Sequence, residues 1–296
     1  MDHCLYQAQG EEMDQTSYPV NCILDGVSFQ LAAPEDFGWL KKYGTVFKVW
    51  DQQSSGNLCF GVDGPWGKLF IKYAGAHTLR FEGDPAEAVY TLQQAMPLYE
   101  VRHLALVKLL AHGPVNGGYA AVFAWQDGFV LREGPGGENK AQLQALPLWH
   151  VLSMLDGIID LHVQLAEMGY VAVDFYDGNL LVNPQTGQMV LCDADLYRKK
   201  PALNDRGRMF GSARFMAPEE FERGASITES TTVFNLAALA FEIFGDNMDR
   251  RKKRWRGPLP LYEVAARATA EKPMERYATI LAFQSAWRHA VSQLNL

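Results

Sequence analysis

Three polar side chains stand at a spacing that suits phosphoryl transfer. Four residues separate Asp174 from Asn179, and a strand, a turn and a second strand then lead to Asp193. Because a hairpin returns the chain beside its start, Asp193 is expected near Asn179, and a carboxylate and an amide oxygen are hard ligands for Mg²⁺. Asp174, on the preceding loop, is then placed to meet an incoming hydroxyl on the far side of a γ-phosphate.

The spacing alone is weak evidence, because carboxylates at such positions also serve as turn and cap residues. The downstream stretch 211–220, Gly-Ser-Ala-Arg-Phe-Met-Ala-Pro-Glu-Glu, adds a second and more specific signal. It resembles the end of the protein-kinase activation segment, Gly-Thr-x-x-Tyr-Met-Ala-Pro-Glu. Over residues 40–290 the chain therefore resembles a divergent bacterial serine/threonine protein kinase.

Other segments resemble kinase motifs and occur in the order that the family has them. They are 43–49 (end of the glycine-rich loop), Lys72 in Phe-Ile-Lys (the strand lysine), 103–109 (after the regulatory helix), 122–128 (gatekeeper and hinge), Leu161-His162 (the helix before the catalytic loop) and 270–277 (the late arginine segment).

The resemblance implies ATP and Mg²⁺ as cofactors and assigns roles to named residues. The implied catalytic residues are Lys72 (on the α and β phosphates), Asp174 (orienting the hydroxyl and accepting its proton) and Asn179, which also holds the metal with Asp193. The implied nucleotide contacts are Gly44 near the phosphates, Val46 and Leu181 against adenine, Phe123 as gatekeeper, and the backbone of Ala124 to Gln126. Glu219 and Arg276 would form a buried ion pair, and Ser212 matches the Thr that contacts the catalytic Asp.

Several positions depart from the family pattern. The catalytic loop has Ala172 and Val173 where the family has His-Arg, and Tyr176 replaces a Lys near the γ-phosphate. Thr232 replaces the buried Asp that braces the catalytic loop. These losses leave open a pseudokinase, a nucleotide-binding scaffold without turnover.

A second open alternative is a small-molecule kinase on the same fold. The stretches 177–180 (Asp-Gly-Asn-Leu) and 193–195 (Asp-Ala-Asp) are similar to kinases of the aminoglycoside-phosphotransferase type. In that case Asp195 would be an extra metal ligand, and its other interpretation is a solvated turn carboxylate. The segment from Ser212 to Glu219, which positions a peptide in the family, favours a protein acceptor instead.

Three further features carry open questions. The glutamate partner of Lys72 is either Glu87 or absent, since spacing back from the motif at 103 reaches Gln94. Residues 194–211 contain no Ser or Thr, so we expect packing, not phosphorylation, to order this segment. The basic run 250–256 is either a docking site for an acidic partner or a solvated loop.

The elements that must position these residues form an α+β pattern. Strand-like alternation over 22–31 around an Asp-Gly turn, over 68–73, 106–110 and 119–125 precedes long helical patterns over 148–165 and 232–244. Asp84-Pro85 starts a helix that Pro97 is expected to end or bend. We therefore predict a bilobal kinase-like fold with a strand-pair extension (1–36), a β-rich N-lobe with one main helix (37–127) and a mostly helical C-lobe (128–296).

Composition excludes some classes of protein. The 296 residues are 48% hydrophobic, which excludes wholesale disorder, and the net charge of −7 disfavours a nucleic-acid partner. No apolar run reaches the length of a membrane span, and the first 15 residues are acidic without Lys or Arg, unlike a secretory signal. The four cysteines have no disulfide or zinc spacing. The sequence thus predicts a cytoplasmic location and no membrane partner, and it does not identify the substrate.

Overall fold

The structure is a computed structural model, and it describes residues 19–132, 138–246 and 249–294. Residues 1–18 of the predicted extension, including those judged unlike a secretory signal, lie outside the described residues. Among the described residues, no helix is both long and apolar enough to cross a membrane.

The first part of the chain is built from antiparallel strands. β1 (Val20–Leu24) and β2 (Val27–Leu31) pair around Asp25 and Gly26, both of which have positive φ, so the predicted strand pair is confirmed. A five-stranded sheet follows in the order β3-β4-β5-β7-β6. Its strands are β3 (Thr45–Trp50), β4 (Asn57–Gly64), β5 (Gly67–Ala74), β6 (Leu109–Val115) and β7 (Gly118–Ala124). The strand expected at 106–110 begins later than predicted, at Leu109.

The two faces of the five-stranded sheet pack against different partners. One face, with Val46, Phe60 and Ile71, joins β2 and the short 3₁₀ helix η1 (Gly38–Lys42) in a separate apolar core. The other face bears Lys72 and Phe123 and is turned toward helix α1 (Pro85–Tyr99). Side chains alternate along a strand, so neighbours of Lys72 in sequence point into the opposite core.

Helix α1 begins as predicted and ends later than predicted. The Asp84 side chain caps it by accepting a hydrogen bond from the Ala86 amide, and Pro85 stands in its first turn. The expectation that Pro97 ends the helix is wrong, because the helix continues to Tyr99. Pro97 has no amide hydrogen to donate to the preceding turn, so the helix lacks one hydrogen bond there. The helix nevertheless continues for two more residues.

The second part of the chain is mainly helical. Its helices are α2 (Glu138–Gln144), α3 (Leu148–Glu167), α4 (Glu229–Phe244), α5 (Leu259–Ala268) and α6 (Ile280–Ser292). The helical patterns predicted over 148–165 and 232–244 are confirmed as α3 and α4. Helix α4 is buried on all sides and packs against α3, α5 and α6, as its apolar sequence indicates.

Short elements connect these helices. They are β8 (Phe129–Val130), β9 (Tyr170–Val171), η2 (Asp177–Asn179), β10 (Leu180–Asn183), β11 (Gln188–Leu191), β12 (Arg198–Lys199), β13 (Ala202–Leu203), η3 (Pro218–Phe221), β14 (Ser226–Ile227), η4 (Lys252–Arg254) and η5 (Pro273–Glu275).

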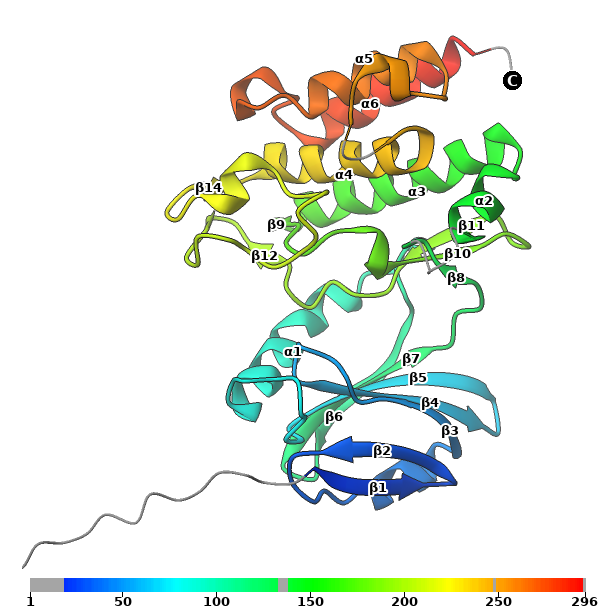
Figure 1. The fold of residues 1–296 in the computed structure, drawn as a ribbon, viewed down its shortest axis with the longest axis vertical. Helices are drawn as coiled ribbons and strands as arrows, with labels where there is room; N and C mark the ends of the chain where they lie inside the picture. Colours follow the sequence, from blue (N-terminus) through cyan, green and yellow to red (C-terminus); the bar gives the residue numbers. More distant parts are fainter. Residues whose placement is uncertain (1–18, 133–137, 247–248, 295–296) are drawn as a thin grey trace, which may run out of the picture.

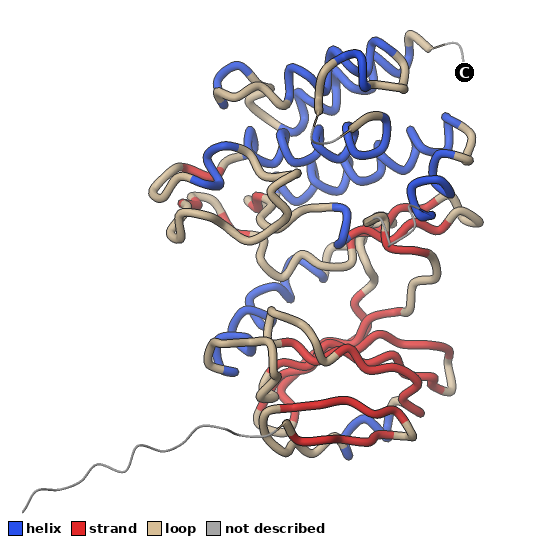
Figure 2. The backbone as a smooth tube through the Cα atoms, viewed as in Figure 1, coloured by secondary structure: helices blue, strands red, loops and turns tan. Residues whose placement is uncertain are grey.

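The strands and helices separate in space as well as in sequence. Figure 1 shows β1 to β7 with α1 in one part and α2 to α6 in the other. The colouring in Figure 2 gives the same division, with α1 the main helix beside the sheet. The chain passes between the parts after Ala124, where β7 ends, and β8 then pairs with β10. The predicted α+β class is confirmed.

Candidate functional site

Lys72 lies on the central strand β5, on the face turned toward α1. Only 3% of its surface is exposed, and its Nζ lies 3.1 Å from Asp193 Oδ1 and 2.9 Å from Asp195 Oδ2. Burial alone would lower the pKa of Lys72, but the two carboxylates outweigh burial and hold that pKa well above its ordinary value. The side chain is therefore a fixed cation between the two parts of the chain.

The predicted hairpin between Asn179 and Asp193 is present as β10 and β11. Leu180 pairs with Leu191, and the Cys192 amide donates to the Asn179 carbonyl at 2.8 Å, so Asp193 follows directly beside Asn179. The Asn179 side-chain nitrogen donates to the Asp174 carbonyl at 2.7 Å. The structure thus brings Asp174, Asn179 and Asp193 together with Lys72.

The oxygens of Asn179 and Asp193 fit a magnesium ion. Within the described ranges no donor occupies the Asn179 amide oxygen, and 44% of the Asp193 side chain is exposed. An amide oxygen and a carboxylate are the donors that Mg²⁺ prefers, and Mg²⁺ commonly completes its shell with water and substrate phosphates. No group of three or more His, Cys, Asp or Glu side chains suited to a metal occurs among the described residues, so a two-residue site of this kind would depend on those other ligands.

Asp174 occupies a strained backbone conformation with φ of 62°, which is uncommon for any residue other than glycine. Burial, followed by the charges of Asp193 and Asp195, raises the pKa of Asp174 to about 7. No described residue donates a hydrogen bond to its carboxylate, and Gly211 of the downstream segment lies against it. A carboxylate without a donor and with a pKa near neutrality suits a proton acceptor.

Asp195 is not the solvated turn residue that the sequence allowed, and its geometry does not assign it to a metal, because its oxygens bond to protein donors. It is 8% exposed, and its Oδ1 accepts a hydrogen bond from the Tyr99 hydroxyl at 2.7 Å. Its Oδ2 accepts from Lys72 at 2.9 Å and from Asn57 Nδ2 at 3.1 Å. Both oxygens are occupied by protein donors, and the side chain is turned inward.

Helix α1 supplies no carboxylate to Lys72 among the described residues. Glu87 and Gln94 are both exposed, so of the two outcomes predicted for the lysine's glutamate partner, absence is the one found. The α1 residue that reaches the site is Tyr99, in the final turn after Pro97.

Two contacts hold the loop that bears Asp174, and Thr232 stands in place of the Asp of the kinase pattern. The Ala172 amide donates to Thr232 Oγ1 of α4 at 3.0 Å, so a hydroxyl acts as the brace. Arg214 donates to both oxygens of buried Asp177 at 2.9 and 2.7 Å and also binds Glu242 of α4. The loop bearing Asp174 is thereby tied to α4 and to the downstream segment.

The segment 194–211 is ordered by packing and short strand pairs. Tyr197 is buried and its hydroxyl lies 2.8 Å from Nε2 of buried His162, whose pKa burial lowers to about 4. β12 pairs with β9, and β13 pairs with β14. Ser212 forms no hydrogen bond with Asp174 among the described residues. These contacts agree with the expectation that packing orders the segment.

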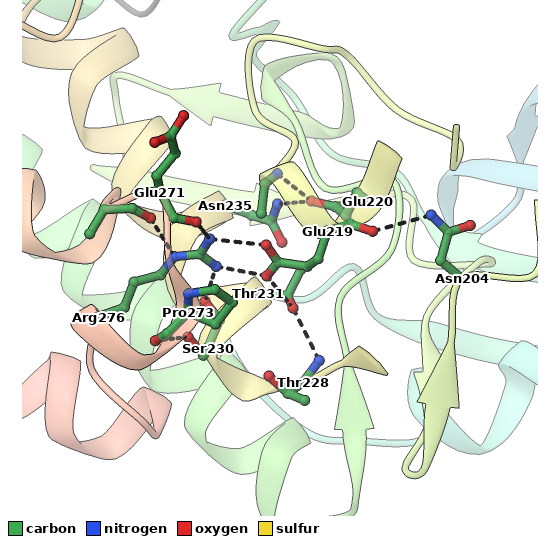
Figure 3. A network of polar contacts seen from close by, with 12 residues as sticks. Asn204, Glu219, Glu220, Thr228, Ser230, Thr231, Asn235, Glu271, Pro273 and Arg276 are labelled. Atoms are coloured by element: carbon green, nitrogen blue, oxygen red, sulfur yellow. Dashed lines mark hydrogen bonds and ion pairs between the residues drawn. The ribbon is translucent and has the colours of Figure 1, made fainter. Parts of the chain in front are cut away.

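The predicted ion pair between Glu219 and Arg276 is confirmed. Arg276 donates to both Glu219 oxygens at 2.7 and 2.9 Å, and Thr231 donates to the same carboxylate at 2.8 Å. Figure 3 shows how the network continues through the neighbouring Glu220 to Asn235. Burial raises the pKa of Glu220 to about 7. The network fastens the segment after Gly211 to α4 and η5.

Not all residues predicted to contact adenine lie on the same face of the sheet as Lys72. Val46 is buried on the face opposite Lys72, because the register of β3 shifts between Val46 and Lys48. The neighbouring Phe47 packs over Gly61 and Trp125 on the Lys72 face, so it takes the place predicted for Val46. Gly44 is required by a close approach, since a Cβ there would meet the Asp63 carbonyl.

The remaining predicted contacts lie on or near the Lys72 face. Phe123 pairs in register with Phe70 on that face and packs on Tyr99 with ring centroids 5.0 Å apart. Leu181 is half-buried on β10 and pairs with Val130. The Ala124 amide donates to Lys108, so it is not available to a nucleotide, whereas no described acceptor takes the Gln126 amide.

A groove elsewhere does not belong to this site. It has a volume of about 910 Å³ and is lined mainly by side chains from 99–112, with Gln126 and Gln188. It takes in Tyr99, but none of the four residues Lys72, Asp174, Asn179 and Asp193 lines it.

The basic run 250–256 contains one buried residue, Trp255, and mostly exposed basic side chains. Trp255 is buried against Phe241 and Phe244, and Arg250 donates to the Arg214 carbonyl. Arg251 and Arg254 pair with Asp249. Arg251 to Arg254 and Arg256 are exposed, so the docking site and the solvated loop both stay predictions.

Sequence reasoning missed several residues around Lys72 and the loop that bears Asp174. They are Asn57 and Tyr99 beside the lysine, Arg214 on the loop, and Phe47 over Gly61 and Trp125. The Asp-Ala-Asp spacing signalled Asp195 as chemically active, but only the fold shows that it turns inward. No sequence signal marked Tyr99, since Pro97 was expected to end or bend the helix before it.

No protein-family model matches this chain, and no curated protein matches it in sequence.

Proposed function

We propose that this protein is an ATP- and Mg²⁺-dependent phosphotransferase, a serine/threonine protein kinase with a bilobal kinase-like fold. One observation carries the proposal: Lys72 Nζ lies 3.1 Å from Asp193, at a site where Asp174 and Asn179 also converge. Lys72 comes from the five-stranded sheet, and Asn179 and Asp193 flank the β10–β11 hairpin. These residues meet where the two parts of the chain face each other. The proposal includes the predicted N-lobe (37–127), the C-lobe (128–296) and a cytoplasmic location.

The proposed reaction moves the γ-phosphate of ATP to a hydroxyl. The hydroxyl oxygen bonds to the γ-phosphorus, the bond from that phosphorus to the bridging β-phosphate oxygen breaks, and ADP leaves. Asp174 accepts the hydroxyl proton, and Lys72 holds the α and β phosphates. A magnesium ion held by Asn179 and Asp193 would offset the negative charge on the transferring group.

The departures from the family pattern should lower the rate of phosphate transfer more than they disturb the position of the site residues. Thr232 and Arg214 brace the catalytic loop in place of the missing groups. Tyr176 supplies no cation near the γ-phosphate, and loss of one such electrostatic contact costs about 10²–10³-fold in rate. We therefore expect slow turnover rather than none.

A protein acceptor is favoured over a small molecule by the segment after Gly211. This segment lies against Asp174, and the Glu219–Arg276 network fixes its far end. A segment fixed in this way beside the proton acceptor would support an extended peptide. Asp195, which suggested a small-molecule kinase, is occupied by Lys72 and Tyr99.

Incubation of the purified chain with γ-labelled ATP and Mg²⁺ tests the proposal. Generic basic, neutral and acidic protein acceptors should be compared with a panel of hydroxyl-bearing small molecules. We expect label on protein Ser or Thr in the wild type and none in Lys72→Met. Label on small molecules alone would replace the protein acceptor, and Mg-ATP binding without any transfer would indicate a pseudokinase.

A further inference from the structure

We propose that Asp195 and Tyr99 act as a positioning pair for Lys72, taking the place of a helix-borne glutamate and linking α1 to the phosphate site. The inference rests on the proposed function, because it assigns Lys72 to nucleotide phosphates. It goes further by naming which groups set the position of that lysine.

The first argument is that both oxygens of Asp195 bond to protein donors. Its two oxygens accept three hydrogen bonds, from Tyr99 at 2.7 Å, Lys72 at 2.9 Å and Asn57 at 3.1 Å. A buried carboxylate requires this kind of pairing to offset its lost hydration. Since its oxygens are already engaged by these donors, including the lysine itself, Asp195 acts as a positioning residue for Lys72 and not as a metal ligand.

The second argument is the contrast between the two carboxylates that contact Lys72. The Asp193 side chain is 44% exposed, whereas that of Asp195 is 6% exposed. Asp193 can therefore leave the lysine and bind a metal at the surface of the site. Asp195 stays with Lys72, so the ammonium remains paired and in place when Asp193 is engaged elsewhere.

The third argument is the position of Tyr99 in the last turn of α1. Its hydroxyl donates to Asp195 and accepts a hydrogen bond from the Ala194 amide at 2.8 Å. Its ring packs on Phe123, and Lys72 Nζ lies 5.8 Å from the ring centroid. A displacement of α1 would remove the hydroxyl from Asp195, so the helix position controls the carboxylate that holds the lysine.

A double-mutant cycle on Mg-ATP binding tests this pair. Asp195→Asn and Tyr99→Phe should each be made in the wild type and in a Lys72→Met background, with dissociation constants measured by calorimetry. Since a hydrogen bond to a charged group is involved, we expect Asp195→Asn to weaken Mg-ATP binding about tenfold and Tyr99→Phe about threefold. Neither change should weaken binding further once Lys72 is Met.

The controls separate positioning from folding and from metal binding. Tyr73→Phe removes another buried hydroxyl, one that contacts Glu35 on the opposite face of the sheet, and should leave Mg-ATP affinity unchanged. Melting temperatures identify any variant that is merely unfolded. The Mg²⁺ concentration for half-maximal ATP binding should stay constant in Asp195→Asn, because Asp195 is not a metal ligand.

Several outcomes would overturn the inference. They are effects that add fully to Lys72→Met, a raised Mg²⁺ requirement in Asp195→Asn, or tighter Mg-ATP binding in that variant, which would make the pair an inhibitory clamp. If the wild type binds Mg-ATP without transferring phosphate, the proposed function fails and this inference stands. If the wild type does not bind Mg-ATP, both fail.

Discussion

The side-chain amide of Asn179 donates a 2.7 Å hydrogen bond to the main-chain carbonyl of Asp174. One residue therefore has two tasks in the proposed mechanism, because its nitrogen fixes the loop that bears the proton acceptor while its oxygen faces the metal. This arrangement makes the geometry of Asp174 depend on an intact amide.

Asn179→Asp should separate the two tasks. The variant keeps an oxygen for the metal but loses the donor to the Asp174 carbonyl, so we expect kcat to fall about 10²-fold while Mg-ATP affinity changes little. Steady-state kinetics and calorimetry measure the two quantities. Asn183→Asp, at the last residue of β10, keeps the oxygen that accepts from the Gln185 amide and should leave kcat unaltered. A kcat equal to the wild type in Asn179→Asp would contradict the coupling.

The transfer rate should depend on pH through Asp174. Burial and the neighbouring charges of Asp193 and Asp195 raise the pKa of Asp174 to about 7, and only the ionised carboxylate accepts a proton. The rate should therefore rise as pH increases toward 7 and level off above it. Excess Mg²⁺ should move the midpoint to lower pH, because the cation offsets the charge of Asp193. A rate that is flat from pH 5 to 8, measured with saturating ATP, would remove Asp174 from the rate-limiting step.

Glu219→Gln should strongly destabilise the fold. Arg276 is buried and would keep its charge without a carboxylate, which costs about 3–5 kcal/mol of unfolding free energy. Urea denaturation measures the loss. Glu275→Gln alters the exposed pair with Lys272 and should have no measurable effect. Equal stabilities for the two variants would show that the network in Figure 3 does not hold the segment.

Thr232→Val tests the hydroxyl brace of the catalytic loop. The Ala172 amide would be left buried without an acceptor, at a cost of about 1–3 kcal/mol in unfolding free energy. We also expect kcat to decrease, since the loop bearing Asp174 loses its tie to α4. Thr269→Val, near the end of α5, removes a hydroxyl that bonds only to its own helix and should leave kcat unchanged. A stable, fully active Thr232→Val protein would exclude the brace.

Sequence patterns predicted the elements whose causes are local. The Asp25-Gly26 turn, the Asp84 cap, the hairpin after Asn179 and the apolar helix α4 each follow from neighbouring residues, and each is present. The Glu219–Arg276 pair was predicted only because a resemblance supplied both partners.

The errors arise where the outcome depends on contacts distant in sequence. Pro97 was expected to end or bend α1, but the helix continues to Tyr99, whose ring packs against Phe123. The face of Val46 was misassigned because a bulge in β3 shifts the register, and no residue pattern marked that bulge. The partners of Asp195 come from β4, β5 and α1, so its burial depends on the tertiary fold.

The most direct test of the central claim is phosphate transfer by Asp174→Asn beside the wild type. The substitution removes the proton acceptor and keeps the shape of the side chain, so we expect Mg-ATP binding to persist and incorporation of labelled γ-phosphate to be lost. Asp156→Asn, which alters an ion pair with Arg288 at the distant α3–α6 contact, should transfer phosphate at the wild-type rate. Incorporation by Asp174→Asn equal to that of the wild type would contradict the account.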